Sequence, residues 1–176
     1  MSDPILIPAV AIVGRSKSGK TTLIEKLLPV LHARGYRVGT IKHHAHAGFE
    51  IDYEGKDTWR HAQAGSDHVV IVAPDKLASI RRLAAEPGIA EVINTVMADV
   101  DLVLTDGYKS SPLPKIEVVR AARSDAPICE PGELIALATD LPLGLGVPCF
   151  DPDDAEGLAD LIVARVIGPF KAERKA

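Results

Sequence analysis

The residues that most constrain the fold of this chain are 14–21, GRSKSGKT, because they match the phosphate-binding pattern GxxxxGK[ST]. The apolar run 9–13 precedes them and is too short for a helix, so we expect a buried strand there. After the glycine loop, Leu23, Leu27 and Leu31 recur at helical spacing. A strand, a glycine-rich loop and a helix in this order predict a P-loop.

The loop has the chemistry of a polyphosphate site. Successive backbone N–H groups and the first turn of the following helix would point at one small volume and attract negative charge. We expect Lys20 to reach the terminal phosphates in a catalytic role and Thr21 to take one position on Mg²⁺. The residues predicted to bind the nucleotide here are Gly14, Arg15, Ser16, Lys17, Ser18, Gly19, Lys20, Thr21 and Thr22.

The rest of the chain alternates strand-like and helix-like segments. Further strands are expected at 37–41, 68–73, 101–107, 115–120 and 134–138, and helices near 57–65, at 87–98 and after Asp153 or Asp154. The segment 76–83 fits a strand or a helix equally well. This alternation predicts an α/β fold, a P-loop NTPase-like three-layer sandwich with a mostly parallel central sheet, in one domain spanning residues 1–176.

Ligands of such sheets bind at the carboxyl ends of the strands, so the residues that follow each strand are candidates for the site. Asp106 ends the run 101–107 and is placed to hold Mg²⁺ together with Thr21, directly or through a water. A turn aspartate before Gly107 is the alternative reading.

A polar segment follows the second expected strand. It contains His43, His44 and His46, which could bind a transition metal, although a solvated or anion-contacting loop fits the pattern better. Asp52 and Asp57 could position water or a second-shell contact to Mg²⁺, or serve as a turn acid and a helix cap. Asp57 is counted with Lys20 and Asp106 as a predicted catalytic residue.

Thr139 and Asp140 follow the strand at 134–138. A carboxylate at Asp140 could accept both N1–H and the amino group of guanine, an arrangement that adenine cannot supply. The common Asn-Lys-x-Asp motif for guanine is absent. The sequence therefore indicates a purine nucleotide, and guanine rests on Asp140 alone.

Composition limits the partners. The formal net charge is −4 and the chain has no basic stripe, so nucleic acid is not an expected partner. No run of 18 apolar residues and no cationic leader is found, so we expect no membrane association and a cytoplasmic location. Cys129 and Cys149 are far apart and belong to no CxxC pair, so neither receives a role.

Taken together, the motifs resemble one known family. The runs GRSKSGKTT, GTIKHHAH, IDYEGKDT, AGSDHVVIVA, DLVLTDGYK, KIEVVR, IALATDLPL and DAEGLADLI make the chain similar, nearly end to end, to the MobB family of molybdopterin-guanine dinucleotide biosynthesis proteins. The resemblance implies a homodimeric GTP-binding protein with weak GTPase activity. It also implies a MobA-type guanylyltransferase as partner, and it leaves open direct contact with molybdopterin.

Carried over by position, the resemblance assigns a polar segment on the nucleotide side to His43, His46, Asp52, Gly55, Lys56 and Asp57. The family usually has Glu where this chain has Asp106, which shortens the reach to Mg²⁺ by one methylene. Two other classes stay open: a small-molecule kinase, for which Arg81 and Arg82 are a poor lid, and a metal-delivery GTPase that uses the histidines. Arg15 is the candidate arginine finger.

Overall fold

The computed structural model describes residues 4–44, 46 and 48–173. They form two compact units, one made of His44–Pro87 and the other of the described residues on either side of that segment. Each unit is described by itself below. The expectation of a single domain over residues 1–176 stays a prediction.

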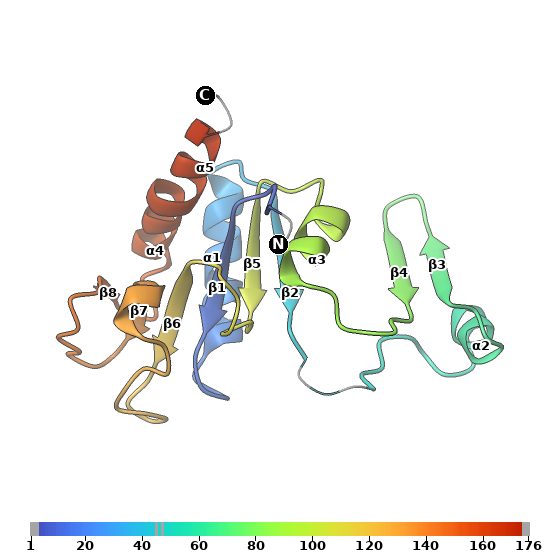
Figure 1. Cartoon of the computed structure of the whole chain (residues 1–176), viewed down its shortest axis with the longest axis horizontal. Helices are drawn as coiled ribbons and strands as arrows, with labels where there is room; N and C mark the ends of the chain where they lie inside the picture. Colours follow the sequence, from blue (N-terminus) through green and yellow to red (C-terminus); the bar gives the residue numbers. More distant parts are fainter. Residues whose placement is uncertain (1–3, 45, 47, 174–176) are drawn as a thin grey trace. The chain divides into compact units, whose positions relative to one another are not determined.

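A six-stranded, all-parallel sheet forms the larger unit, in the order β2-β5-β1-β6-β7-β8. In Figure 1 the arrows of β1, β2, β5 and β6 point the same way. The strands are β1 (Ala9–Val13), β2 (Val38–Lys42), β5 (Leu102–Asp106), β6 (Lys115–Val119), β7 (Leu134–Thr139) and β8 (Cys149–Phe150). This confirms the predicted α/β fold with a parallel central sheet.

Helices cover the two faces of the sheet. They are α1 (Lys20–Ala33), α3 (Ile89–Val96), α4 (Ala155–Ile162) and α5 (Gly168–Glu173), with a π-helical segment, Val163–Ile167, between the last two and a 3-10 turn at Pro131–Glu133. Val10 and Ile12 of β1 belong to the core on the side of α1 and α4. Ala11 and Val13 face the opposite core, where Ile93 of α3 packs. Successive side chains of β1 enter opposite cores, so every residue of the strand must be apolar.

Helices α1 and α4 are tied together at the surface. Arg34 lies 2.6 Å from a carboxylate oxygen of Glu156 and 2.8 Å from one of Asp160. Asp154 caps α4 by accepting a hydrogen bond from Gly157 N at 2.9 Å, as expected for this position. These contacts hold α1, and with it the P-loop, against the C-terminal helices.

The smaller unit contains α2 (Asp57–Gln63) and an antiparallel pair, β3 (His68–Val72) and β4 (Leu77–Arg81). The two arrows of this pair point in opposite directions in Figure 1. The ambiguous segment 76–83 is therefore a strand, and it pairs with β3 outside the parallel sheet. The apolar run 68–73 predicted the strand but gave no sign of its separate sheet.

One helix boundary and one short strand differ from the expectation. The predicted helix 87–98 begins only at Ile89, because Gly88 is extended (φ −63°, ψ 148°) and serves as the N-cap. The two-residue strand β8 was not predicted, since so short a segment has no periodicity to detect.

Candidate functional site

The P-loop lies at the carboxyl end of β1, in the middle of the sheet. After β1 the chain forms β2 and later β5 on one side of β1, and it then crosses to β6 on the other side. Such a reversal of direction is where open α/β sheets bind their ligands. Gly19 (φ 104°) is the N-cap of α1, so the helix N-terminus begins at Lys20.

Gly14 cannot be replaced without strain. Its φ is 139°, and a Cβ there would lie 2.5 Å from the carbonyl oxygen of Val118 in β6 and 2.9 Å from Ser18 Oγ. The absence of a side chain at Gly14 thus lets the loop pass close to β6. Lys17 also has a left-handed backbone conformation, with φ 60°. Loops that turn their backbone N–H groups inward to bind an anion use this conformation.

Lys20 folds back over the loop. Its Nζ donates to the carbonyl oxygens of Gly14 at 3.0 Å and of Arg15 at 2.8 Å. Partial burial lowers the pKa of Lys20, an effect that nearby Lys42 reinforces and Asp106 opposes. The ammonium is therefore held at the mouth of the loop with a neighbouring carboxylate.

Thr21 and Asp106, the two predicted Mg²⁺ ligands, are brought together. Thr21 Oγ1 donates to Asp106 Oδ2 at 3.0 Å. Asp106 is 7% exposed, and its other oxygen, Oδ1, is buried with no hydrogen-bond partner among the described residues. A hydroxyl and a buried, under-satisfied carboxylate are hard oxygen donors of the kind Mg²⁺ prefers, so these residues fit that ion.

The other loop residues are arranged differently from one another. Arg15 Nε donates to Ser124 Oγ at 3.1 Å, in the loop after β6. Ser18 Oγ is buried without a hydrogen-bond partner in the described structure, whereas Ser16 and Thr22 are exposed. The orphan hydroxyl of Ser18 marks the inside of the loop as a place where a further polar group would be accommodated.

Of the predicted histidines, His43 lies beside the site. Its backbone N donates to the carbonyl oxygen of Asp106 at 3.1 Å, and its ring lies 4.5 Å from that of Tyr108. His44 and His46 have ring centroids 6.0 Å apart. In residues 4–44, 46 and 48–173, no three His, Cys, Asp or Glu side chains are grouped as a metal site would require.

The remaining predicted residues of this segment belong to the smaller unit. Asp52 Oδ1 accepts from Tyr53 N at 2.8 Å, Lys56 is the N-cap of α2, and Asp57 is its first residue, 3.9 Å from Arg60. Asp57 therefore lies one position after the cap. The prediction that Asp52, Lys56 and Asp57 face a nucleotide stays a prediction.

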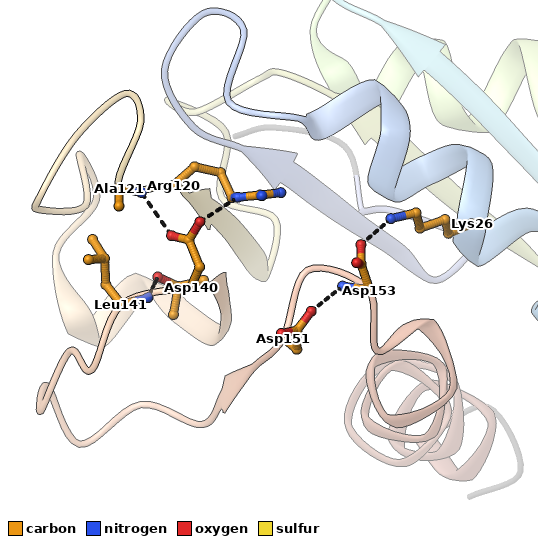
Figure 2. A network of polar contacts seen from close by, with 8 residues as sticks. Lys26, Arg120, Ala121, Asp140, Leu141, Asp151 and Asp153 are labelled. Atoms are coloured by element: carbon orange, nitrogen blue, oxygen red, sulfur yellow. Dashed lines mark hydrogen bonds and ion pairs between the residues drawn. The ribbon is translucent and has the colours of Figure 1, made fainter.

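Thr139 and Asp140 lie at the carboxyl end of β7. Figure 2 shows the Asp140 carboxylate held from two sides, by Ala121 N at 2.8 Å and by Arg120 Nε at 2.9 Å. The hydrogen bond from Ala121, followed by that from Arg120, lowers the pKa of Asp140. Thr139 Oγ1 accepts from Leu141 N at 3.0 Å. Asp140 is thus an ionised, oriented carboxylate.

The sequence reasoning missed three side chains that meet predicted ones: Lys42, Ser124 and Arg120. Lys42 Nζ lies 2.7 Å from Asp106 Oδ2, Ser124 pairs with Arg15, and Arg120 pairs with Asp140. Lys42 and Arg120 stand at or just after a strand end, which is a signal that the sequence offered. Ser124 had no such signal.

Comparison with known proteins decides the family. The model of the family described as molybdopterin guanine dinucleotide synthesis protein B matches residues 9–140. The chain belongs to the MobB family.

Individual MobB relatives match over most of their lengths. The molybdopterin-guanine dinucleotide biosynthesis adapter protein of Escherichia coli K12 is 34% identical over 170 residues, covering 93% of this chain and 95% of that protein. The adapter protein of Haemophilus influenzae is 38% identical over 160 residues, covering 89% and 88%.

Solved structures agree with the fold. A crystal structure of molybdopterin-guanine biosynthesis protein B superposes with a TM-score of 0.70 at 31% identity, covering 89% of this chain and 97% of that one. Bacillus subtilis MobB gives 0.72 at 28% identity, covering 92% and 99%. None of the helices described here has the length and apolar character that crossing a bilayer requires.

Proposed function

We propose that this chain is a GTP-binding adapter of molybdopterin-guanine dinucleotide biosynthesis, with weak GTPase activity and a MobA-type guanylyltransferase as its partner. The adapter role rests on the family, whose relatives carry that description. Nucleotide binding rests on one observation above all: Thr21 bonds to Asp106, and Lys20 bonds to the carbonyl oxygens of a loop whose Gly14 has no room for a side chain.

The residues divide the work of binding. The loop N–H groups and the N-terminus of α1 would receive the phosphates, and Lys20 would exchange its loop carbonyls for phosphate oxygens. Thr21 and Asp106 would hold Mg²⁺, which supplies charge neutralisation for phosphoryl transfer to water. His43 and Asp57 are proposed to belong to the polar segment that faces the nucleotide.

Hydrolysis by this site should be slow. Arg15, the candidate finger, donates a hydrogen bond to Ser124 Oγ, whereas Lys20 Nζ donates to the carbonyl oxygens of Gly14 and Arg15. P-loop GTPases turn over at about 10⁻⁴ per second without an assisting arginine and at about 10⁻² per second with one supplied by their own chain. A slow rate suits a protein whose bound nucleotide governs contact with a partner.

Guanine preference rests on Asp140. Its two oxygens offer about four acceptor positions, and the contacts with Ala121 and Arg120 occupy two of them. The lowered pKa keeps the carboxylate ionised, as an acceptor for both N–H groups of guanine must be. Arg120 orients the carboxylate without consuming its remaining acceptor positions.

Calorimetric titration with GTP, GDP and ATP in Mg²⁺ tests the proposal. We expect GTP to bind at least about tenfold tighter than ATP, or about 1.4 kcal/mol, with Lys20→Ala abolishing binding and Asp140→Asn removing only the preference. Lys109→Ala, an exposed lysine after β5, is the matched control and should change neither. Equal affinity for ATP and GTP would exclude a guanine site, and binding that survives Lys20→Ala would exclude the P-loop.

A homodimer formed through β3 and β4 is the second part of the proposal. The two strands expose Val70, Ile71, Val72, Leu77 and Ile80, and a groove of about 700 Å³ is lined in part by Ile71 and Ile80. Unpaired strand edges and exposed apolar side chains favour pairing with another chain. A second copy of the chain has the same two strands, so it could pair with the strand edges and cover the apolar side chains.

A further inference from the structure

Lys42 contacts the atom on which the proposed metal site depends. Its Nζ lies 2.7 Å from Asp106 Oδ2. The same oxygen accepts the hydrogen bond from Thr21 Oγ1 at 3.0 Å. One carboxylate oxygen therefore receives a cation and a hydroxyl, while Oδ1 of the same group is buried without a hydrogen-bond partner in the described residues.

Strand register places the lysine there. Lys42 is the last residue of β2 and lies opposite Asp106 of β5 in the parallel pairing. The next residue, His43, donates its backbone N to the carbonyl oxygen of Asp106 at 3.1 Å, which extends the pairing past the strand end. The approach of Lys42 is thus fixed by the backbone, and its side chain has only to turn toward Asp106.

The contact between Lys42 and Asp106 balances the charge of the carboxylate. Asp106 is a nearly buried carboxylate, with 10% of its side chain exposed. Lys20, the other nearby ammonium, gives two of its hydrogen bonds to loop carbonyls. The positive charge in contact with Asp106 comes from Lys42, whose side chain is 62% exposed and can turn into solvent.

We propose that Lys42 is the resident counter-cation of Asp106 in the nucleotide-free site and competes with a divalent metal ion for that carboxylate. This rests on the proposed function, because it assigns Asp106 to the metal. With Asp106 held by a metal ion, the Lys42 ammonium would turn from Asp106 Oδ2 into solvent. Lys42 is then a positioning residue that holds Asp106 ready and raises the metal concentration needed to occupy the site.

The proposal predicts that removing the ammonium strengthens metal binding. The probe is Mn²⁺, a hard divalent ion whose free form is counted by electron paramagnetic resonance, added to the full chain without nucleotide. Lys42→Met should bind Mn²⁺ about two- to fivefold tighter than wild type, because the Lys42 side chain is mostly in solvent and the pair should therefore contribute about as much as a surface ion pair. Lys109→Met removes the same charge from an exposed position three residues after Asp106 and should match wild type.

Equal Mn²⁺ affinity in wild type and Lys42→Met, or an equal gain in Lys109→Met, would overturn the proposal. Circular dichroism of each variant shows whether the fold is kept. Lys42→Arg, which retains the charge, should restore the wild-type affinity.

Titration with GDP, with Mg²⁺ and with EDTA, gives a second readout. The dissociation constant of GDP in EDTA, divided by that in Mg²⁺, should be larger for Lys42→Met than for wild type. The reason is that the metal ion no longer competes with Lys42 for Asp106. A smaller ratio would place Lys42 on the phosphates instead and overturn the proposal. If wild type binds no GDP under either condition, the proposed function fails, and the Mn²⁺ comparison still decides the role of Lys42.

Discussion

Two five-residue strands with similar sequences have opposite surroundings in this molecule. β1 reads AVAIV and all its residues are buried, whereas β3 reads HVVIV and only Val69 is buried. β1 lies between two neighbouring strands and under helices on both faces, while β3 pairs with β4 alone among the strands that the structure describes. Strand formation is thus common to both, and burial is not.

The difference shows what an apolar run can indicate. Its composition favours a strand because branched side chains suit the extended backbone. Its burial depends on the elements that pack against it, which lie far away in the sequence. A two-stranded sheet is marginal without further cover, so the exposed apolar side chains of β3 and β4 require an explanation that the interior of the large sheet does not.

Core truncation should separate the two regions most strongly. Leu104→Ala in β5 removes a fully buried side chain, and we expect it to lower the free energy of unfolding by about 2–5 kcal/mol. Ile71→Ala in β3, where the side chain is exposed, should change it by about 0.5 kcal/mol or less. Urea unfolding at one protein concentration measures both.

Comparable losses for Leu104→Ala and Ile71→Ala would contradict the contrast between the regions. A loss at Ile71 that grows with protein concentration would have a different meaning, because it would report on association of two chains rather than on the packing of one.

Two glycines with positive φ allow a finer comparison. Gly55→Ala in the smaller unit meets no atom within 4 Å and should cost only the backbone strain of about 1–2 kcal/mol. Gly14→Ala adds a Cβ 2.5 Å from Val118 O, and overpacking should cost about 1–3 kcal/mol more. Thermal unfolding measures the loss of stability in both variants. Equal losses would show that β6 can move away from the added Cβ at Gly14.

Much of the fold could be predicted because its signals are local. The strand, glycine loop and helix at 9–33 are specified by adjacent residues, and the parallel sheet follows from the alternation of elements. The segment 76–83 could not be assigned, since a short apolar run fits both periods. Its pairing with β3, and the separate sheet they form, depend on contacts outside the segment.

The site divides in the same way. Thr21 and Asp106 were expected to meet, because strand ends of a parallel sheet share one edge, and the structure brings them to 3.0 Å. The contacts of Lys42 with Asp106 and of Arg120 with Asp140 depend on strand register, which a single sequence does not state. Roles in nucleotide binding stay predictions for all of these residues.

The exposed face of the hairpin should matter for association and hardly at all for the stability of one chain. Val72 is 70% exposed and lies opposite Leu77, which is 64% exposed. Val72→Lys places a charge on this face, so it should convert a dimer into a monomer of 18.7 kDa while changing the unfolding free energy of the monomer by less than about 0.5 kcal/mol.

Light scattering coupled to size-exclusion chromatography gives the mass, and Val96→Lys is the matched control, since Val96 is a valine of similar exposure, 64%, on α3. The control should leave the dimer intact. A dimer that survives Val72→Lys would place the interface elsewhere, and a monomeric wild type at micromolar concentration would remove the homodimer from the proposal. Dissociation by Val72→Lys alone would show that the apolar run of β3, unlike that of β1, is buried by a second copy of the chain.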